Sequence, residues 1–295
     1  SGGLLTTAKH FPGHGDTGTD THISLPLIDT PWSRRASLAL VPFRAAIKSG
    51  VAAVMSAHIA LPGIDSGQVR PATLTPTLLT GVLRDSLRFN GLVVTDALDM
   101  GGIANTYGPG EAAVLALLAG ADILLQPTDP AVAIDAVVAA VEQGRVTQAR
   151  LDQSVRRVLE LKNRLGLFRQ RTVPLDQVME AVGTAEHQAI ARDVTARSLV
   201  LVRDSGGAMT SLRSGPQPVS LLVYADDPAN TLGSTLAGVL RAGGYTVTMF
   251  RLWPSSGPAS LDSARAALAA SPTAVVAASI RVSAWSGTIS MPPHV

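Results

Sequence analysis

The sequence predicts an α/β protein whose strands pair in parallel, and three observations support this prediction. Apolar runs of strand length recur in the first half of the chain, at 4–8, 51–57, 92–95 and 121–126. Patterns typical of helices separate these runs, at intervals of roughly 40 residues. The same alternation resumes at residue 219 and continues to residue 279. Because a helix between two strands returns the chain to the same edge of a sheet, such βα units form parallel sheets.

The helical patterns of the first half complete four βα units. They cover residues 43–48, 76–88, 111–119, 131–142 and 147–166. We expect Thr75 to cap the second helix, with Pro76 at its first position. The last helix is strongly amphipathic and is expected to end at Gly166. Four units are half of the eight in a (β/α)8 barrel, so either they form an open sheet or the first half of a barrel is absent.

The remainder of the chain predicts a connecting segment and a second α/β region. The connecting segment, residues 169–198, contains a helical pattern at 185–198. Strands are expected at 199–202, 219–225, 245–250 and 274–279, with helices at 231–241 and 261–270. Residues 280–295 contain no closing element, so we expect this region to be cut short. The predicted parts are therefore 1–168, 169–198 and 199–295.

Polar side chains follow the apolar runs of the first half. Lys9 and His10 follow the first run, His58 the second, Asp96 the third and Gln126 the fourth. Since the carboxyl ends of barrel strands carry the active site, this pattern favours a catalytic face. The alternative is helix N-capping in an ordinary α/β sheet, which Asp96 in particular could serve.

The composition argues against several classes of function. Of 295 residues, 46% are apolar and 16% are charged, as in a globular protein rather than a disordered one. The formal net charge of +2 and the lack of a basic run argue against a nucleic-acid partner. The chain has no cysteine for a disulfide or a thiolate site, and no apolar run reaches the ~18 residues that span a membrane.

The segment AKHFPGHGDTGTDTH, residues 8–22, contains three of the chain's six histidines and one of its three lysines. One interpretation is a polar loop with incidental histidines. Another is a dinucleotide-binding loop, because Gly13, Gly15 and Gly18 have the G-x-G-x-x-G spacing. That loop must open a helix, and the β-branched residues, Pro26 and Pro31 that follow it argue against one.

A metal site is a further interpretation of the same segment, because His10, His14, Asp20 and His22 are ligand types. The His10–His14 spacing binds zinc on a helix, and Pro12 forbids that helix. Acid–base chemistry is the interpretation that the residues favour. Asp20 and His22 are two apart in an extended loop, so the carboxylate can hold the imidazole in one tautomer. The best partner is Asp96, which a buried strand would hold rigidly.

These residues also resemble a known family. KHFPGHGDTGTDTH together with GLVVTDALDM is similar to the glycoside hydrolases of family 3, in the branch of the β-N-acetylglucosaminidases, or β-hexosaminidases. The pattern K-H-F-P-G-H-G, four further residues and then D-x-H is specific to that branch. PFRAAIKSGVAAVMSAHIALPGID, PATLT, LDQSVRRVLELKNRLGLF and ARSLVLVRD agree with it, and the likeness is to the two-domain bacterial members.

The resemblance implies retaining hydrolysis of terminal β-linked N-acetylglucosamine (GlcNAc), typically from cell-wall muropeptides, without a cofactor or metal. Asp96 matches the nucleophile that forms the glycosyl-enzyme, His22 the acid/base and Asp20 its partner. Lys9 and His10 match residues that bind the sugar hydroxyls. We also place His58 and Met100 among the substrate-binding residues.

The resemblance implies, as fold, the C-terminal half of a (β/α)8 TIM-type barrel followed by a partial α/β sandwich domain. Since the missing half normally supplies further sugar ligands, we expect residues 1–295 alone to be inactive or nearly so. A glycoside phosphorylase is the alternative activity, because a histidine repels phosphate less than a glutamate does. A non-catalytic fragment is the alternative of another class. Two-domain relatives are often exported, which favours the cell envelope or exterior over the cytoplasm.

Overall fold

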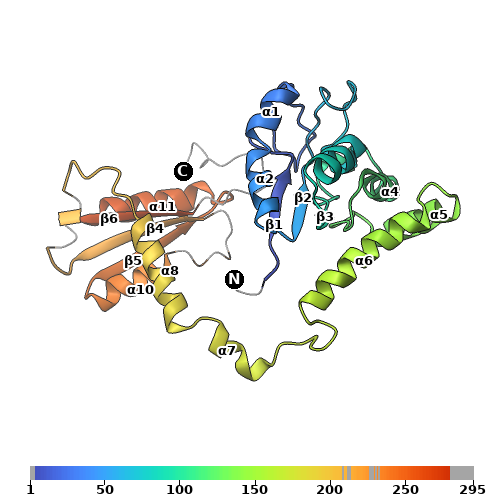
Figure 1. The fold of residues 1–295 in the computed structure, drawn as a ribbon. Coiled ribbons are helices and arrows are strands. Elements are labelled where there is room, and N and C mark those ends of the chain that lie inside the picture. Colours follow the sequence, from blue (N-terminus) through green and yellow to red (C-terminus); the bar gives the residue numbers. More distant parts are fainter. Residues whose placement is uncertain are drawn as a thin grey trace. The chain divides into compact units, whose positions relative to one another are not determined.

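The computed structural model describes residues 4–207, 209–210, 214–225, 229, 231 and 233–279. The chain divides into two compact units, Ser1–Val173 and Pro174–Val295, and both are mixed α/β structures with a parallel sheet (Figure 1). No helix of the described ranges has both the length and the apolar surface to cross a membrane.

The sheet of the first unit has three parallel strands in the order β1-β2-β3. They are β1 (Thr7–Phe11), β2 (Ala53–Ser56) and β3 (Leu92–Val94). Parallel pairing of these units is confirmed, but two details differ from expectation. Lys9 and His10 lie within β1 rather than after it, because β1 pairs with β2 from Thr7 onward. The expected strand at 121–126 is reduced to one parallel bridge between Val94 and Ile123.

The five predicted helices of the first unit are present in the predicted order, and three short ones that were not predicted are added. They are α1 (Trp32–Leu38), α2 (Val41–Lys48), η1 (Ala72–Leu74), η2 (Thr77–Ser86), α3 (Gly101–Ala104), α4 (Pro109–Ala119), α5 (Pro130–Glu142) and α6 (Gln148–Arg164). The sequence analysis did not predict α1, η1 or α3. The expected cap at Thr75 is wrong, because its hydroxyl donates to the Pro71 carbonyl instead. Asp129 and Thr147 do cap α5 and α6 with their side-chain oxygens.

The core of this unit lies between the sheet and the helices that cover it. Val54 of β2 and Val93 of β3 are fully buried, and so are Leu79 and Leu83 of η2. The segment η2 approaches α4 closely at Gly120, whose φ of +124° and lack of a Cβ leave room for the side chain of Thr80. The Thr80 hydroxyl donates to the Ala119 carbonyl over 2.9 Å. This contact holds η2 against the end of α4.

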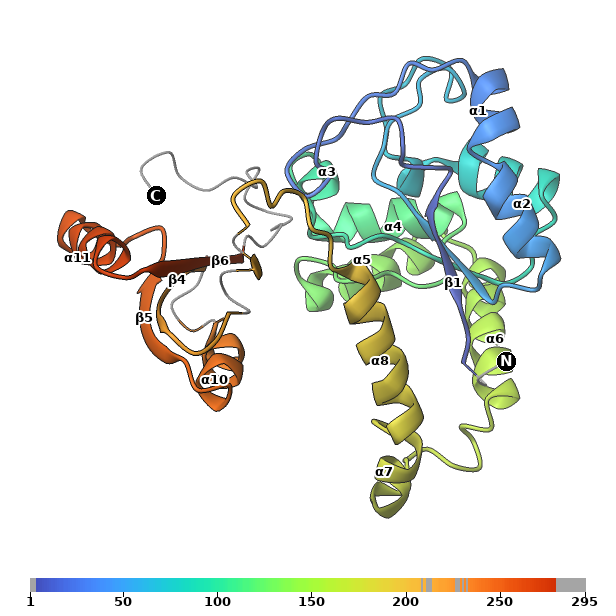
Figure 2. The ribbon, with the colours of Figure 1, turned by 90° about the vertical axis from the view of Figure 1, so that its left-hand side faces the viewer.

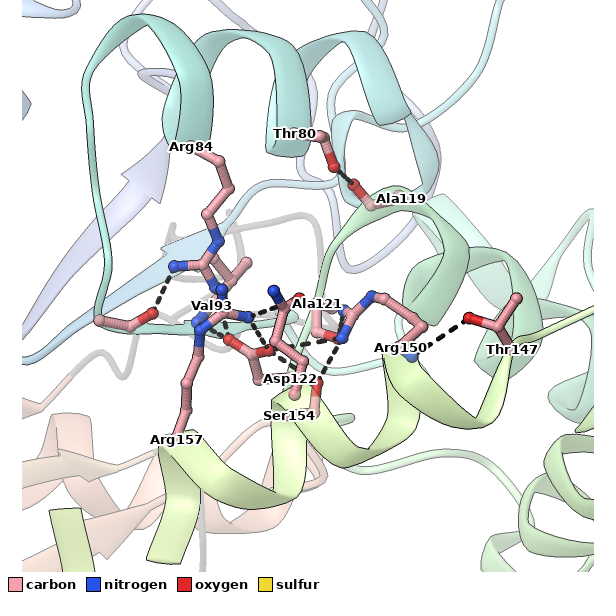
Figure 3. Close-up of polar contacts among 12 residues, drawn as sticks. Thr80, Arg84, Val93, Ala119, Ala121, Asp122, Thr147, Arg150, Ser154 and Arg157 are labelled. Carbon is pink, nitrogen blue, oxygen red and sulfur yellow. Dashed lines mark hydrogen bonds and ion pairs between the residues drawn. The ribbon is translucent and has the colours of Figure 1, made fainter. Parts of the chain in front are cut away.

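A buried carboxylate, Asp122, ties α6 to the sheet (Figure 3). Its Oδ2 accepts hydrogen bonds from Arg84 at 2.5 Å and from the Val93 N–H at 3.0 Å. Its Oδ1 accepts from Ser154 at 2.7 Å and from Arg157 at 2.9 Å. A third arginine, Arg150, lies 3.7 Å from the same oxygen. Four hydrogen-bond donors thus converge on one fully buried carboxylate. Asp122 therefore acts as a structural centre at the amino ends of the strands.

The second unit contains η3 (Leu175–Gln177), α7 (Val178–Ala181), α8 (Ala185–Ser198) and a parallel sheet of order β5-β4-β6. The strands are β4 (Pro218–Ala225), β5 (Thr246–Leu252) and β6 (Thr273–Ser279). Helices α10 (Ser234–Ala242) and α11 (Pro258–Ala269) lie on opposite faces of this sheet (Figures 1 and 2). Accordingly, Leu221 and Val223 pack with Ala237 on one face, and Tyr224 and Leu252 with Ala264 on the other.

One predicted strand of the second unit is wrong. Residues 199–202 form no strand, and their side chains are 68% to 91% exposed. Four apolar residues in a row match the strand pattern, but they pair with no strand in the described part of the unit. The predicted helix at 185–198 is confirmed. The expectation that residues 280–295 hold no closing element lies outside the described residues.

Candidate active site

A pocket of about 550 Å³ in the first unit brings together most of the predicted site residues. It is lined by Lys9, His10, His14, Gly15, Asp20, Thr21, His22, Asp96 and Met100. Three separate segments of the chain supply this lining: β1, the loop that follows it, and the turn after β3. Lys9 and Met100 are 91 positions apart in the sequence. They meet at one pocket because β1 and β3 both pair with β2 in parallel, so that their carboxyl ends lie on the same side of the sheet.

Asp96 is held at the end of β3 with much of its carboxylate uncommitted. Within the described part of the chain it accepts one hydrogen bond, from the Ala97 N–H to Oδ1 at 2.9 Å. Its other oxygen, Oδ2, lies 3.6 Å from Nε2 of His10. The side chain is 14% exposed and faces the pocket. Helix capping does not account for it, since Met100 is the N-cap of α3. A partly shielded carboxylate with free lone pairs can act as a nucleophile.

His10 is the ionisable group next to Asp96. Burial lowers the pKa of the His10 imidazole below its usual value of 6.5, and the negative charge of Asp96 opposes that effect. The ring is therefore mainly neutral at pH 7. A neutral imidazole beside Asp96 adds a dipole and a hydrogen-bonding group to the pocket without neutralising the carboxylate. Lys9, the preceding residue of β1, supplies the one lysine of the lining.

Asp20 and His22 form a hydrogen-bonded dyad on the loop after β1. Oδ1 of Asp20 lies 2.7 Å from Nδ1 of His22 and also accepts the His22 backbone N–H at 2.9 Å. The hydrogen bond from that N–H is the main cause that lowers the pKa of Asp20. A carboxylate on Nδ1 keeps the proton there and so fixes the tautomer of the imidazole. The arrangement suits a group that donates and then accepts a proton.

The turn after Asp96 holds the loop of this dyad through the backbone. The N–H groups of Gly101 and Gly102 donate to the carbonyls of His22 and Thr21, at 2.9 and 3.1 Å. The side-chain amide of Asn105 donates to the Ile23 carbonyl at 2.8 Å. A Cβ at Gly101 would collide with the Ile23 carbonyl and crowd that of His22. Glycine at position 101 therefore permits the backbone that follows Asp96 to lie directly against the backbone of the His22 loop.

Two predicted substrate-binding residues have different positions in the structure. Met100 is 3% exposed and contributes to the pocket lining. His58 is fully buried and lies outside that lining. Its Nδ1 lies 2.9 Å from the Thr73 hydroxyl and its Nε2 lies 2.8 Å from the Ala97 carbonyl. The structure thus places His58 behind Asp96 rather than on the pocket wall.

Sequence reasoning missed several residues that shape the site. Gly101 and Asn105 hold the dyad loop, and the pair of glycines after DALDM could have indicated a close backbone approach. Arg35 of α1 is 2% exposed, donates to the Gly13 carbonyl and lies 3.1 Å from Asp16. It anchors the loop from behind. Nothing in the pattern around residue 35 indicated this, because α1 itself was not predicted.

The alternative interpretations of residues 8–22 can be compared with the geometry. The glycines of the G-x-G-x-x-G spacing open no helix, since the next helix, α1, begins at Trp32. In the described ranges, no group of three or more His, Asp or Glu side chains is arranged to hold a metal ion. The geometry that is present, a carboxylate facing an Asp–His dyad across a pocket, is that of acid–base and nucleophilic chemistry.

Comparisons with known proteins agree on one family. The family model described as "Glycosyl hydrolase family 3 N terminal domain" matches residues 1–161. The "Beta-N-acetylglucosaminidase/beta-glucosidase" of Cellulomonas fimi is 34% identical over 223 residues, which are 72% of this chain and 39% of that protein. "Beta-hexosaminidase A" of Pseudoalteromonas piscicida is 32% identical over 240 residues, 75% of this chain and 39% of that protein. The chain thus spans about two fifths of the length of these curated relatives.

Solved structures show the same likeness. A glycoside hydrolase family 3 beta-N-acetylglucosaminidase from Paenibacillus sp. str. FPU-7 matches with a TM-score of 0.77 at 34% identity, over 93% of this chain and 53% of that one. The beta-glucoside phosphorylase BglX matches with a TM-score of 0.79 at 26% identity, over 99% of this chain and 55% of that one.

Proposed function

Because the chain belongs to glycosyl hydrolase family 3, we propose that it carries the reacting groups of a retaining β-N-acetylglucosaminidase. The observation that carries this proposal is the shared pocket, in which the turn after β3 supplies Asp96 and the loop after β1 supplies the Asp20–His22 dyad. The names of the relatives from Cellulomonas, Pseudoalteromonas and Paenibacillus support GlcNAc as the sugar.

The proposed reaction has two steps. In the first, an Asp96 oxygen attacks the anomeric carbon, and His22 donates the proton from Nε2 to the glycosidic oxygen as that bond breaks. In the second, neutral His22 accepts a proton from water, the water oxygen attacks the anomeric carbon, and Asp96 leaves as a carboxylate. Asp20 stabilises the imidazolium whenever it forms. Lys9 and His10, with Met100, line the pocket where the sugar would bind.

The proposed natural substrates are peptidoglycan fragments with a terminal, non-reducing β-GlcNAc. The test compares release of nitrophenol from the GlcNAc and glucose glycosides, using the protein with the flanking sequence that its gene encodes. We expect a specificity constant that clearly favours GlcNAc; equal constants would contradict the proposal. Mass spectrometry of muropeptides before and after treatment tests the source, with loss of one GlcNAc as the expected result.

Phosphorolysis is the second candidate, favoured by the likeness to a beta-glucoside phosphorylase. A histidine acid/base carries no negative charge that would repel an incoming phosphate. The two activities differ in their product, since hydrolysis gives the free sugar and phosphorolysis gives the sugar 1-phosphate. Product analysis with and without inorganic phosphate separates them. We expect free GlcNAc and a rate that does not depend on phosphate.

We further propose that residues 1–168 are the second half of a TIM-type barrel, that 169–198 connect, and that 199–295 are part of an α/β sandwich domain. The division of the chain near residue 173 and the parallel βα order of both units support this. Limited proteolysis tests it: we expect the first cleavage within 169–198, and a first cleavage inside β1–β3 or β4–β6 would contradict it.

A further inference from the structure

His58 is a fully buried histidine whose two ring nitrogens are both engaged with the protein. It lies two residues after β2, and neither nitrogen reaches the pocket. Nε2 lies 2.8 Å from the Ala97 carbonyl, and Nδ1 lies 2.9 Å from the Thr73 hydroxyl. Burying a polar ring costs free energy unless both nitrogens are satisfied, as they are here. A histidine at this position therefore has a specific hydrogen-bonding role in addition to filling space in the core.

The hydrogen bonds fix the tautomer of His58. A carbonyl oxygen can only accept, so Nε2 carries a proton and donates to Ala97. Burial lowers the pKa of His58, so the ring is neutral at pH 7 and Nδ1 is an acceptor. It faces the Thr73 hydroxyl, which also lies 3.1 Å from the Ala57 carbonyl and can donate to either group. The Thr73 oxygen in turn lies 2.8 Å from the Ser56 hydroxyl, which can donate to it. The result is a buried hydrogen-bonded cluster of Ser56, Thr73 and His58, in which His58 donates to the Ala97 carbonyl.

Ala97 is the residue that follows Asp96, and both of its backbone groups are committed. Its N–H donates to Oδ1 of Asp96, and its carbonyl accepts from His58. Rotation of this turn would break one bond or the other. The next residue, Leu98, donates its N–H to the Leu125 carbonyl at 2.9 Å. The Ala97 carbonyl also accepts the Met100 N–H at 3.2 Å. In the part of the chain that the structure describes, His58 supplies the one side-chain hydrogen bond that the turn of Asp96 receives from outside it.

His58 also contacts the segment that holds the dyad loop. A Cβ built on Gly102 would lie 3.0 Å from the Cβ of His58, so the two residues touch without a side chain between them. The Gly102 N–H donates to the Thr21 carbonyl, beside His22. The same imidazole thus supports the turn of Asp96 and packs against the backbone that carries the Asp20–His22 loop.

We propose that His58 is a positioning residue that fixes the Asp96 turn through the Ala97 carbonyl, and that it does not contact the sugar. This inference rests on the proposed function, in which Asp96 is the nucleophile. A nucleophile must be held in line with the anomeric carbon, and an error of about 1 Å can lower a rate by about 100-fold. Loss of His58 should therefore slow the chemical step and leave sugar binding nearly unchanged.

The test compares His58→Leu with His58→Gln in the protein with the flanking sequence that its gene encodes. Glutamine has an N–H donor at the place of Nε2, whereas leucine has none. We expect His58→Leu to lower kcat by about 10- to 100-fold with KM within a few-fold, and His58→Gln to recover most of the loss. Ser154→Ala, which removes a buried hydrogen bond at the Asp122 centre, is the matched control and should leave kcat unchanged.

Two outcomes would overturn the inference. One is a folded His58→Leu variant with the wild-type kcat; the other is a raised KM at unchanged kcat, which would mean that His58 binds the sugar. If His58→Leu does not fold, nitrogen NMR of the wild type still decides the hydrogen bond, since we expect a neutral ring protonated at Nε2. The opposite tautomer would contradict the inference.

A separate experiment distinguishes failure of the proposed function from failure of this inference. A mechanism-based fluorosugar should label Asp96 in the wild type. If it labels another residue, the proposed function is wrong, whereas labelling of Asp96 at equal rates in the wild type and His58→Leu refutes the positioning role alone.

Discussion

Two aspartates of the same sheet, Asp96 and Asp122, show how surroundings decide what a carboxylate does. Asp122 stands where the fourth βα unit begins and is fully buried, with hydrogen bonds from Arg84, Arg157 and Ser154 (Figure 3). Asp96 stands where β3 ends and accepts one hydrogen bond among the described residues. The first has its lone pairs committed to fixed donors, and the second presents them to a pocket.

The difference lies in which partners the two ends of the sheet supply. At the amino ends, long arginines from η2 and α6 reach one fully buried carboxylate and satisfy it. At the carboxyl ends, backbone N–H groups and histidines leave room for a ligand. We therefore expect stability to depend on Asp122 and turnover to depend on Asp96, and each prediction below tests that division.

The largest effect is expected for Asp96→Asn. The amide cannot form the glycosyl-enzyme, so turnover should fall by orders of magnitude, while the free energy of unfolding changes little because one backbone N–H remains to be accepted. Steady-state kinetics and a urea titration measure the two quantities. Labelling of a residue other than Asp96 by a mechanism-based fluorosugar would contradict the assignment.

His22→Ala should have the next largest effect, and it should depend on the leaving group. General acid catalysis contributes about 100- to 10,000-fold where the leaving oxygen needs a proton. The loss should be large on a GlcNAc disaccharide and small on a dinitrophenyl glycoside, whose leaving group needs no proton. His14→Ala, in the same pocket lining, is the control and should be milder on both. Equal losses on the two substrates would exclude the acid role of His22.

Asp122→Asn should have the opposite effect to Asp96→Asn: it should lower stability and leave turnover unchanged. Removing the charge leaves three arginines without their counter-ion, which costs about 3–5 kcal/mol when a buried ion pair is broken. The first unit should unfold at a lower urea concentration, as followed by amide exchange in β3 and α6, while kcat per folded molecule is retained. Asp135→Asn, on the exposed face of α5, is the matched control. A loss of kcat without a loss of stability would break the comparison.

The pairing of Asp20 with His22 could be predicted from the sequence because the two residues lie in one short, dense motif. Asp20 and His22 are two apart in an extended loop, and their hydrogen bond is local enough to be read from spacing. The parallel sheet was equally predictable, because alternating apolar runs and helices allow few other folds. The strand at 199–202 failed for the converse reason, since an apolar run without a pairing partner satisfies the same pattern.

The parts that could not be predicted depend on contacts between distant residues. Asp122 meets Arg157 across 35 positions, and Asn105 meets Ile23 across 82. His58 followed an apolar run as a ligand-binding residue would, and only the fold shows that its Nε2 is engaged 39 positions away, at Ala97. Periodicity and spacing carry no information on such pairs.

Gly101→Ala should change the position of His22 relative to Asp96. An added Cβ would collide with the Ile23 carbonyl, so the dyad loop must move away from the turn of Asp96. We expect kcat to fall by roughly 10-fold from misplacement of His22, with a smaller change in stability. Gly81→Ala, where an added Cβ meets nothing within 4 Å, is the control. Wild-type kcat in Gly101→Ala would show that the loop position is not critical.

The smallest effect concerns the pH dependence of stability between pH 7 and 5, to which His10 and His58 should contribute. Burial lowers the pKa of His10 and His58 below the 6.5 of the unfolded chain. Below pH 6.5 the unfolded chain therefore binds more protons than the folded one, so the free energy of unfolding falls as the pH falls, until the folded pKa is reached. The lowered pKa of Asp20 acts in a separate window, because its stabilisation is lost only as the pH falls below 3.8.

His58→Gln should make this dependence less steep, since glutamine keeps a donor for Ala97 and cannot take up a proton. Urea titrations at pH 7, 6 and 5 measure the slope, and His187→Gln, on the exposed surface of α8, is the matched control. The difference between the two variants isolates the buried ring from every other group that titrates in this range. An unchanged slope in His58→Gln would mean that His58 binds its proton equally well in the folded and unfolded chain, and His10 would then be the histidine beside Asp96 to which the slope is due.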